Sequence, residues 1–188
     1  DKEKYGPYSG WVRDLVFSPN GEYIIFTLSP TKEDGKLVQI YKNESLIGIL
    51  DDDALRHPEP VTLDRFAFSP DSTNFAYVAS LDGLKYVVDG VGKRGPYLDA
   101  YNLVYSNDNK LAYIAVMNIP RAHRFFVFYG NDTMGEYMEC NTLHITSDNK
   151  IVYIGQVYDV GYEIVAGDER ITIEGGSTIA ISPNGKKI

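Results

Sequence analysis

The chain has little cysteine and little positive charge, and each shortage excludes a class of protein. Cys140 is the only cysteine in 188 residues, so no internal disulfide and no cysteine-based metal knuckle can form. The 18 basic residues are scattered and are outnumbered by 26 acidic ones, which gives a formal net charge of −8. Nucleic-acid surfaces need clustered Lys and Arg, so we expect no nucleic-acid partner. Cys140 lies just before an apparent strand, where we expect a small buried residue rather than a nucleophile.

Long apolar runs, long helical periodicity and catalytic motifs are missing as well. No run approaches the roughly 18–20 apolar residues that span a bilayer, so no membrane insertion is expected. The sequence holds no Gly-x-Ser-x-Gly elbow, no Gly-rich phosphate loop and no His-Glu-x-x-His pair. We therefore expect a soluble protein without catalytic residues or a cofactor. What is abundant is aromatic: 15 Tyr and 8 Phe, with 17 Gly and 9 Pro, predict an all-β fold.

One short phrase occurs five times along the chain. It consists of an aromatic or β-branched residue, a hydroxyl residue and a polar turn. The copies begin at residues 17, 68, 105, 145 and 181, so their spacings are 51, 37, 40 and 36 residues. A period near 40 built from short β segments is typical of a repeat architecture.

Each repeat can be divided into four strands. In the third repeat these are residues 101–105, 111–117, 124–129 and 135–139, with polar turns at 107–110 and 130–132. Four antiparallel strands per repeat predict a β-propeller. The complete blades are expected at about 11–50, 61–98, 101–139 and 141–174, with partial blade strands at 4–9 and 177–188. Tyr77, Tyr113 and Tyr153 take the same place in three second strands, where we expect them to pack between blades.

The Ser-Pro-Asn/Asp-Gly phrase resembles the WD40-like PD40 repeats of TolB-type propellers. The match covers residues 17–26, 68–78 and 181–187, with degenerate copies at 105–114 and 145–154. The Trp-Asp dipeptide of true WD40 repeats is missing, since Trp11 is followed by Val12. The resemblance implies the fold rather than an activity. Such propellers occur in periplasmic TolB-like proteins, in substrate-gating domains of prolyl-oligopeptidase-type peptidases and in many bacterial proteins, so it favours a bacterial periplasmic or extracellular location.

The partial strands at both ends leave two arrangements open. The chain is either an excerpt of a larger propeller or a five-bladed ring whose two ends pair. The excerpt would expose an unclosed edge, through which oligomers could form.

Two faces of the predicted propeller differ in their connections. We call first face the one with the turns between first and second strands and between third and fourth strands; these turns are short. We call second face the one with the remaining connections, which are expected to be longer at residues 29–36, 51–62, 116–123 and 156–161. Binding usually resides in variable loops on a rigid scaffold. The candidate ligand-binding residues on the second face are Asp51, Asp52, Asp53, Arg56, His57, Asn118, Arg121, His123, Arg124 and Asp159.

Two parts of this set have specific chemistry. Asp51, Asp52 and Asp53 offer three successive carboxylates to Ca²⁺, but the spacing of a dedicated calcium loop is absent, and a solvated acidic loop is the favoured alternative. The stretch 118–124 is the only locally basic one, suited either to an acidic partner or to a merely solvated loop. His57 and His123 alone do not make a metal site.

Three functions remain open. The leading hypothesis is a non-catalytic scaffold that binds a protein or peptide through its second face. The first alternative is the propeller domain of a larger prolyl-oligopeptidase-like hydrolase, which a Gly-x-Ser-x-Gly segment in a longer chain would reveal. The second alternative is a carbohydrate-binding propeller, since tyrosine-rich surfaces can stack on sugars.

Overall fold

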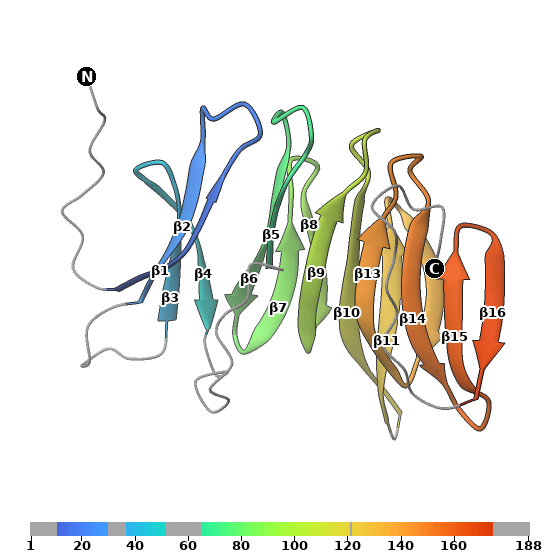
Figure 1. Ribbon diagram of the computed structural model, residues 1–188. Coiled ribbons are helices and arrows are strands. Elements are labelled where there is room, and N and C mark those ends of the chain that lie inside the picture. Colours follow the sequence, from blue (N-terminus) through green and yellow to red (C-terminus); the bar gives the residue numbers. More distant parts are fainter. Residues whose placement is uncertain (1–10, 30–36, 52–64, 121, 175–188) are drawn as a thin grey trace.

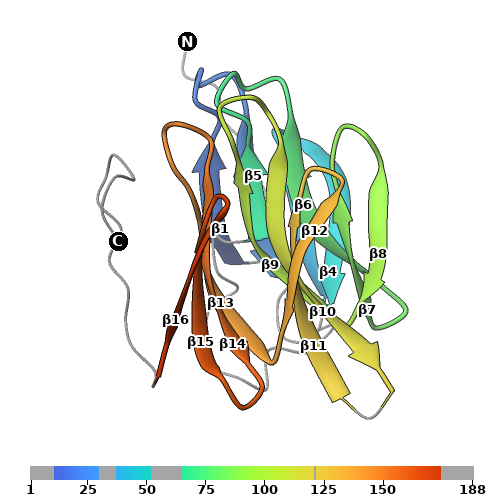
Figure 2. The ribbon, with the colours of Figure 1, turned by 90° about the vertical axis from the view of Figure 1, so that its right-hand side faces the viewer.

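The protein consists of four-stranded antiparallel sheets that stand face to face in a row (Figure 1). The computed structural model describes residues 11–29, 37–51, 65–120 and 122–174. Each sheet is built from four consecutive strands, and the first and last sheets lie at opposite ends of the row. Seen along the row, successive sheets are twisted relative to one another (Figure 2). In the described part of the chain, no helix has the length and apolar character needed to cross a bilayer.

The described strands are distributed four to a sheet, in chain order. The first sheet contains β1 (Trp11–Phe17), β2 (Ile24–Ser29), β3 (Leu37–Lys42) and β4 (Ser45–Asp51). The second contains β5 (Phe66–Phe68), β6 (Phe75–Leu81), β7 (Leu84–Val88) and β8 (Lys93–Tyr97). The third contains β9 (Asp99–Tyr105), β10 (Leu111–Ile119), β11 (Ala122–Tyr129) and β12 (Asp132–Tyr137). The fourth contains β13 (Glu139–Ile145), β14 (Ile151–Val157), β15 (Gly161–Ala166) and β16 (Glu169–Ile173).

The predicted all-β fold of four-stranded antiparallel blades is therefore confirmed, and each sheet is one blade. The partial strands expected at 4–9 and 177–188 lie outside the described residues. The choice between an excerpt and a five-bladed ring accordingly stays a prediction.

The prediction of irregular loops is wrong at two positions of the second face. Residues 116–123 were expected to be an irregular loop, but β10 and β11 stay paired as far as Ile119 and Ala122. Residues 156–161 likewise form the end of a hairpin: Val157 still pairs with Gly161, and only residues 158–160 are turn. The polar residues at these hairpin ends suggested loops, yet an exposed hairpin end tolerates polar side chains without losing its backbone ladder.

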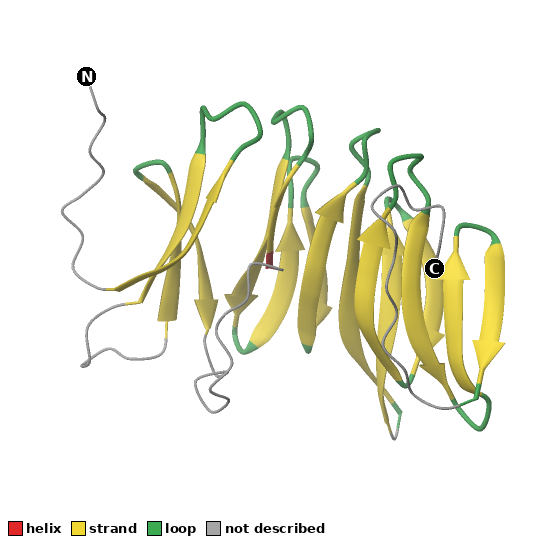
Figure 3. Cartoon of the chain, in the orientation of Figure 1, coloured by secondary structure: helices red, strands yellow, loops and turns green. Residues whose placement is uncertain are grey.

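The repeated phrase owes its form to a buried hydroxyl group. In the second blade, the Ser69 hydroxyl lies 2.6 Å from Oδ1 of Asp71 and accepts a hydrogen bond from the Asn74 amide at 2.8 Å. The hydroxyl group thereby closes the turn on both sides. Ser18, Ser106 and Thr146 make the equivalent bonds in the other three blades, and all four residues are buried. The turns lie along one edge of the row, the first face, at the top of Figure 3.

The fifth residue of the phrase adopts a left-handed backbone conformation in all four described blades, with φ between 61° and 74°. Gly21 needs no side chain there, but the other three blades carry Ser72, Asn109 and Asn149. Each of these three side chains bonds to the turn of the preceding blade. Ser72 accepts from the Asn20 amide at 3.0 Å, Asn109 donates to Asp71, and Asn149 accepts from the Asn107 amide at 2.8 Å. These bonds compensate the cost of a left-handed non-glycine residue.

The interior between blades is built around the three predicted tyrosines. The Tyr77 hydroxyl donates to the Ile47 carbonyl at 2.7 Å, and the Tyr153 hydroxyl donates to the Met134 carbonyl at 3.2 Å. The Tyr113 hydroxyl lies 2.9 Å from that of Tyr97. Each partner belongs to the outer strand of the preceding blade, so the prediction of packing between blades is confirmed. Cys140 is also buried as expected, and this burial raises the pKa of its thiol to about 12.

Loss of one phrase hydroxyl should measurably weaken the fold. Ser69→Ala removes the buried hydroxyl group that accepts the hydrogen bond of the Asn74 amide, so we expect the free energy of unfolding to fall by about 1–3 kcal/mol. Urea unfolding measures the change. Ser147→Ala is the matched control, since Ser147 is an exposed phrase residue; its effect should stay within about 0.5 kcal/mol. Equal losses in the two variants would show that the hydroxyl bonds do not hold the turn.

Candidate functional site

The predicted residues of the second face that the structure describes lie on two hairpins. Asn118 and His123 pair with each other near the end of the β10–β11 hairpin, and both are exposed. Arg124 follows, with Nε 3.5 Å from Oε1 of Glu136 and Nη1 donating to the His123 carbonyl at 3.1 Å. Asp159 is exposed in the β14–β15 turn, with φ at 56°. The basic hairpin and the acidic turn therefore come from neighbouring blades.

Most of the predicted acidic loop lies outside the described residues. Asp51 ends β4, while Asp52, Asp53, Arg56, His57 and Arg121 lie outside the described residues. The Ca²⁺ site at residues 51–53 therefore stays a prediction. Among the residues that the structure does describe, no group of three or more His, Cys, Asp and Glu could hold a metal ion.

Exposed apolar side chains surround Asp159 on the second face. Tyr158 is 66% exposed and Val160 50%, although both stand in a tight turn where polar residues are usual. Met138 is 38% exposed in the connection between the third and fourth blades. Its amide donates to the Gln156 carbonyl at 2.8 Å, which fixes this connection beside the end of β14. Asp159 was predicted from the sequence as a candidate residue, but these apolar neighbours were not.

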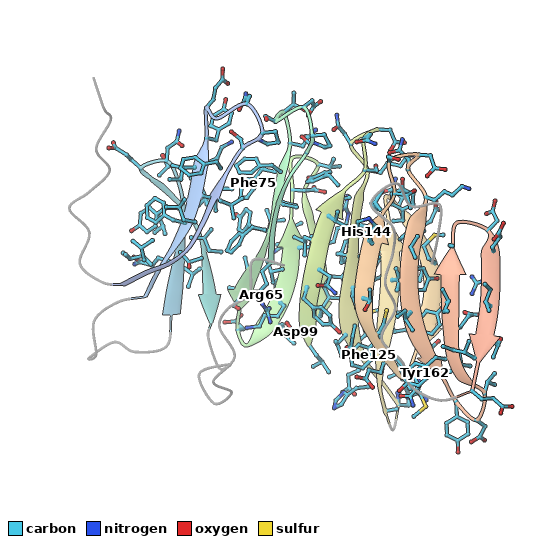
Figure 4. The ribbon with its side chains drawn as sticks, viewed as in Figure 1. Arg65, Phe75, Asp99, Phe125, His144 and Tyr162 are labelled. Atoms are coloured by element: carbon cyan, nitrogen blue, oxygen red, sulfur yellow. The ribbon has the colours of Figure 1, made fainter. Side chains whose placement is uncertain are left out.

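Figure 4 shows the residues of a charged contact near the second face, Arg65 and Asp99. Arg65, which directly precedes β5, places Nη1 2.8 Å from Oδ1 of Asp99 at the start of β9. Arg65 also donates to the Ala100 carbonyl at 3.2 Å. The contact joins the second blade to the third and fixes the relative position of their inner strands. His144 lies in β13, away from these groups.

A polar pocket of about 220 Å³ lies on the first face, between the second and third blades. The β7–β8 turn supplies one wall with Asp89, and β8 adds Arg94. Tyr105 at the end of β9 and the phrase residue Asn109 supply the other wall. Val91, which is 86% exposed, belongs to the same turn as Asp89.

Asp89 and Arg94 form the charged part of this pocket. The Asp89 side chain is only 5% exposed, and its Oδ1 accepts from the amides of Val91 at 2.9 Å and Gly92 at 3.0 Å. Its Oδ2 lies 2.9 Å from Nη1 of Arg94. The two groups form an ion pair, but the buried Nη1 makes no hydrogen bond within the protein. Burial, followed by the Asp89 charge, raises the pKa of Tyr105.

Asn109 supplies a complementary unsatisfied atom. Its Oδ1 is buried and accepts no hydrogen bond, while its Nδ2 donates to Oδ2 of Asp71. Hydrogen bonds, first from the Ser69 hydroxyl, lower the pKa of Asp71, which therefore stays ionised as the acceptor for Asn109. Lys110 also lines the pocket, and its Nζ pairs with Oδ2 of Asp108 at 2.9 Å.

No sequence pattern predicted this pocket. Asn109 falls in the predicted polar turn at 107–110, and Asp89 lies in a turn of the repeat before it. The two are 20 positions apart in the sequence (109 − 89), and only the packing of two blades brings them to one cavity. The one available signal was Arg94, a charged residue shortly after an Asp-Gly turn.

Comparison with solved structures supports the propeller fold. TolB from Acinetobacter baumannii is similar with a TM-score of 0.50 and 15% sequence identity, over 94% of this chain and 47% of that one. The β-propeller domain of the Trilobed protease from Pyrococcus furiosus, described as having an open velcro topology, is similar with a TM-score of 0.51 and 12% identity, over 89% of this chain and 58% of that one. The chain thus spans about half the length of these structures. No family model and no curated protein matches the sequence. The chain is a β-propeller similar in fold to TolB.

Proposed function

We propose that this β-propeller is a non-catalytic scaffold whose second face binds a protein or peptide. The observation that supports the proposal is the group formed by Met138, Tyr158 and Val160, all large, apolar and exposed at the second-face end of the fourth blade, where the Met138 amide bonds to the Gln156 carbonyl. Aromatic residues, Met and Arg are enriched in the centres of protein interfaces. The basic hairpin with His123 and Arg124 comes from the neighbouring third blade, and an acidic rim on a partner would complement it.

A peptide library tests the proposal directly. Random peptides displayed on phage are selected on the protein, and the affinities of enriched peptides are measured by calorimetry. We expect Val160→Asp to weaken binding about tenfold or more, because it places a charge in the apolar group. Val91→Asp is the matched control, since it makes the same change at an exposed valine on the first face, and it should leave the affinity unchanged.

Two outcomes would contradict the proposal. Failure to enrich any peptide would leave the second face without a ligand of the proposed class. Peptides that lose affinity with Val91→Asp and not with Val160→Asp would place the binding on the first face. A longer natural chain with a Gly-x-Ser-x-Gly segment would favour the alternative, a propeller domain of a prolyl-oligopeptidase-like hydrolase.

One observation supports the proposal that oligomers form through an unclosed edge of the propeller. Val12, Leu15 and Phe17 of β1 are exposed on the same face of the first sheet as Leu46 and Ile49 of β4. The opposite face of this sheet buries Ile25 and Ile40 against the second blade. Apolar side chains exposed on one face of a sheet favour association with a further sheet.

A further inference from the structure

We propose that the pocket between the second and third blades binds a neutral sugar unit. This inference is independent of the proposed protein or peptide binding, because the pocket lies on the opposite face of the propeller. Its ligand class follows from three features: two unsatisfied buried atoms, the balance of charge, and the distribution of polar groups around the wall.

The two unsatisfied atoms require a ligand that both donates and accepts. Nη1 of Arg94 is a buried donor without a hydrogen bond, and Oδ1 of Asn109 is a buried acceptor without one. Both residues line the same pocket. A buried polar atom without a partner costs stability, and most such atoms in native proteins have a partner. Neighbouring hydroxyl groups satisfy both atoms, because each hydroxyl can donate and accept.

The balance of charge selects a neutral ligand. Two cations, Arg94 and Lys110, line the pocket, but each already has a carboxylate at 2.9 Å, namely Asp89 and Asp108. Little positive charge is left to favour a phosphate or a carboxylate. The buried Asp89 carboxylate would moreover repel an anion at close range.

The distribution of polar groups around the pocket favours a sugar over a simple amide as the ligand. Asn74 and Asn131 add an amide from each blade, and Tyr105 contributes a phenol ring with a hydroxyl group. A ligand with hydroxyl groups around its whole rim matches such a wall better than one with a single polar end and an apolar stem. The volume of about 220 Å³ is below the roughly 300–1,000 Å³ typical of drug-sized ligands, which limits the ligand to a single ring.

The test uses the 188-residue chain with glucose, galactose, mannose and N-acetylglucosamine as separate probes. Binding is followed by calorimetry and by NMR shifts of the side-chain amides of Asn109 and Asn131. We expect at least one of these sugars to bind and to shift both amides. Glucuronate, the anionic counterpart of glucose, should bind no more tightly than glucose.

Two variants locate the site. Arg94→Lys keeps the positive charge beside Asp89, so the fold should persist, but it loses the guanidinium donors. We expect the affinity of the sugar to fall about tenfold, because a hydrogen bond from a charged group is lost. Asn131→Ala, a change at an exposed turn residue, should also weaken binding. Arg124→Lys is the control, since Arg124 is likewise paired with a carboxylate but lies on the second face.

Three outcomes would overturn the inference. The first is that none of the four sugars binds at millimolar concentration, which would leave the pocket to water. The second is that glucuronate binds more tightly than glucose. The third is sugar binding that both Arg94→Lys and Asn131→Ala leave unchanged. None of these results would affect the peptide experiment, which measures a different face.

Discussion

Tyr153→Ala is expected to lower the free energy of unfolding by about 3–5 kcal/mol, a large part of the stability of a domain of this size. The Tyr153 side chain is fully buried between the third and fourth blades, where its ring meets that of Tyr137 at a centroid distance of 5.6 Å and an angle of 70°. Alanine would leave a cavity the size of a ring. It would also remove the hydroxyl that donates to the Met134 carbonyl.

Two companion variants divide this effect into its parts. Tyr153→Phe keeps the ring and loses only the hydroxyl, so it should cost about 1–3 kcal/mol. Tyr158→Ala removes the same type of side chain from an exposed turn and should change stability by about 0.5 kcal/mol or less. Urea unfolding monitored by circular dichroism measures all three. A Tyr153→Ala variant as stable as Tyr158→Ala would show that the blades are not held together by these rings.

Gly155→Ala is expected to destabilise the same junction by overpacking, by about 1–3 kcal/mol. Gly155 lies in β14, and the ring of Tyr137 from the preceding blade packs directly on its backbone. A Cβ atom at this position would overlap the Tyr137 ring. The ring has little freedom to move away, because its hydroxyl lies 2.8 Å from Oε2 of Glu163 and the side chain is buried.

A double-mutant cycle identifies the cause of that loss. With Tyr137→Leu in place, the ring is gone and Gly155→Ala should cost clearly less than it does alone, with a coupling of about 0.5–3 kcal/mol. Gly130→Ala is unsuitable as a control because Gly130 has a positive φ. Additive effects of Tyr137→Leu and Gly155→Ala would contradict the proposed overlap.

The sequence predicted the parts of this fold that depend on local chemistry. In the four described blades, a hydroxyl residue with Asn or Asp two positions later specifies the strand–turn–strand unit, because Ser69 and its counterparts bond to groups within five residues. The repeat spacing then aligned Tyr77, Tyr113 and Tyr153 and so predicted residues that contact the preceding blade. Strand ends were less predictable, since the β10–β11 ladder extends to Ile119 through pairing alone.

The candidate sites were predictable only in part. Asn118, His123, Arg124 and Asp159 lie on the expected face, but their apolar neighbours Met138 and Val160 carry no sequence signal that distinguishes them from core residues. The pocket residues Asp89 and Asn109 belong to different repeats, and each is a common turn residue in its own repeat. Their juxtaposition depends on the angle between two blades, which no local pattern encodes.

The hydrogen bonds of the left-handed phrase residue have a direction along the chain. Ser72, Asn109 and Asn149 each belong to the later blade and reach back to the turn before it. At the junction of the third and fourth blades the Asn107 side chain also donates forward, to the Ser147 carbonyl at 2.9 Å. Gly21 has no side chain that could do so. A chain leaves the ribosome from its N-terminus, and each blade consists of about 40 consecutive residues. Each new blade can therefore fold and then form hydrogen bonds to a preceding blade that is already folded. Such a linkage lets the row grow by successive addition during synthesis, without waiting for distant segments.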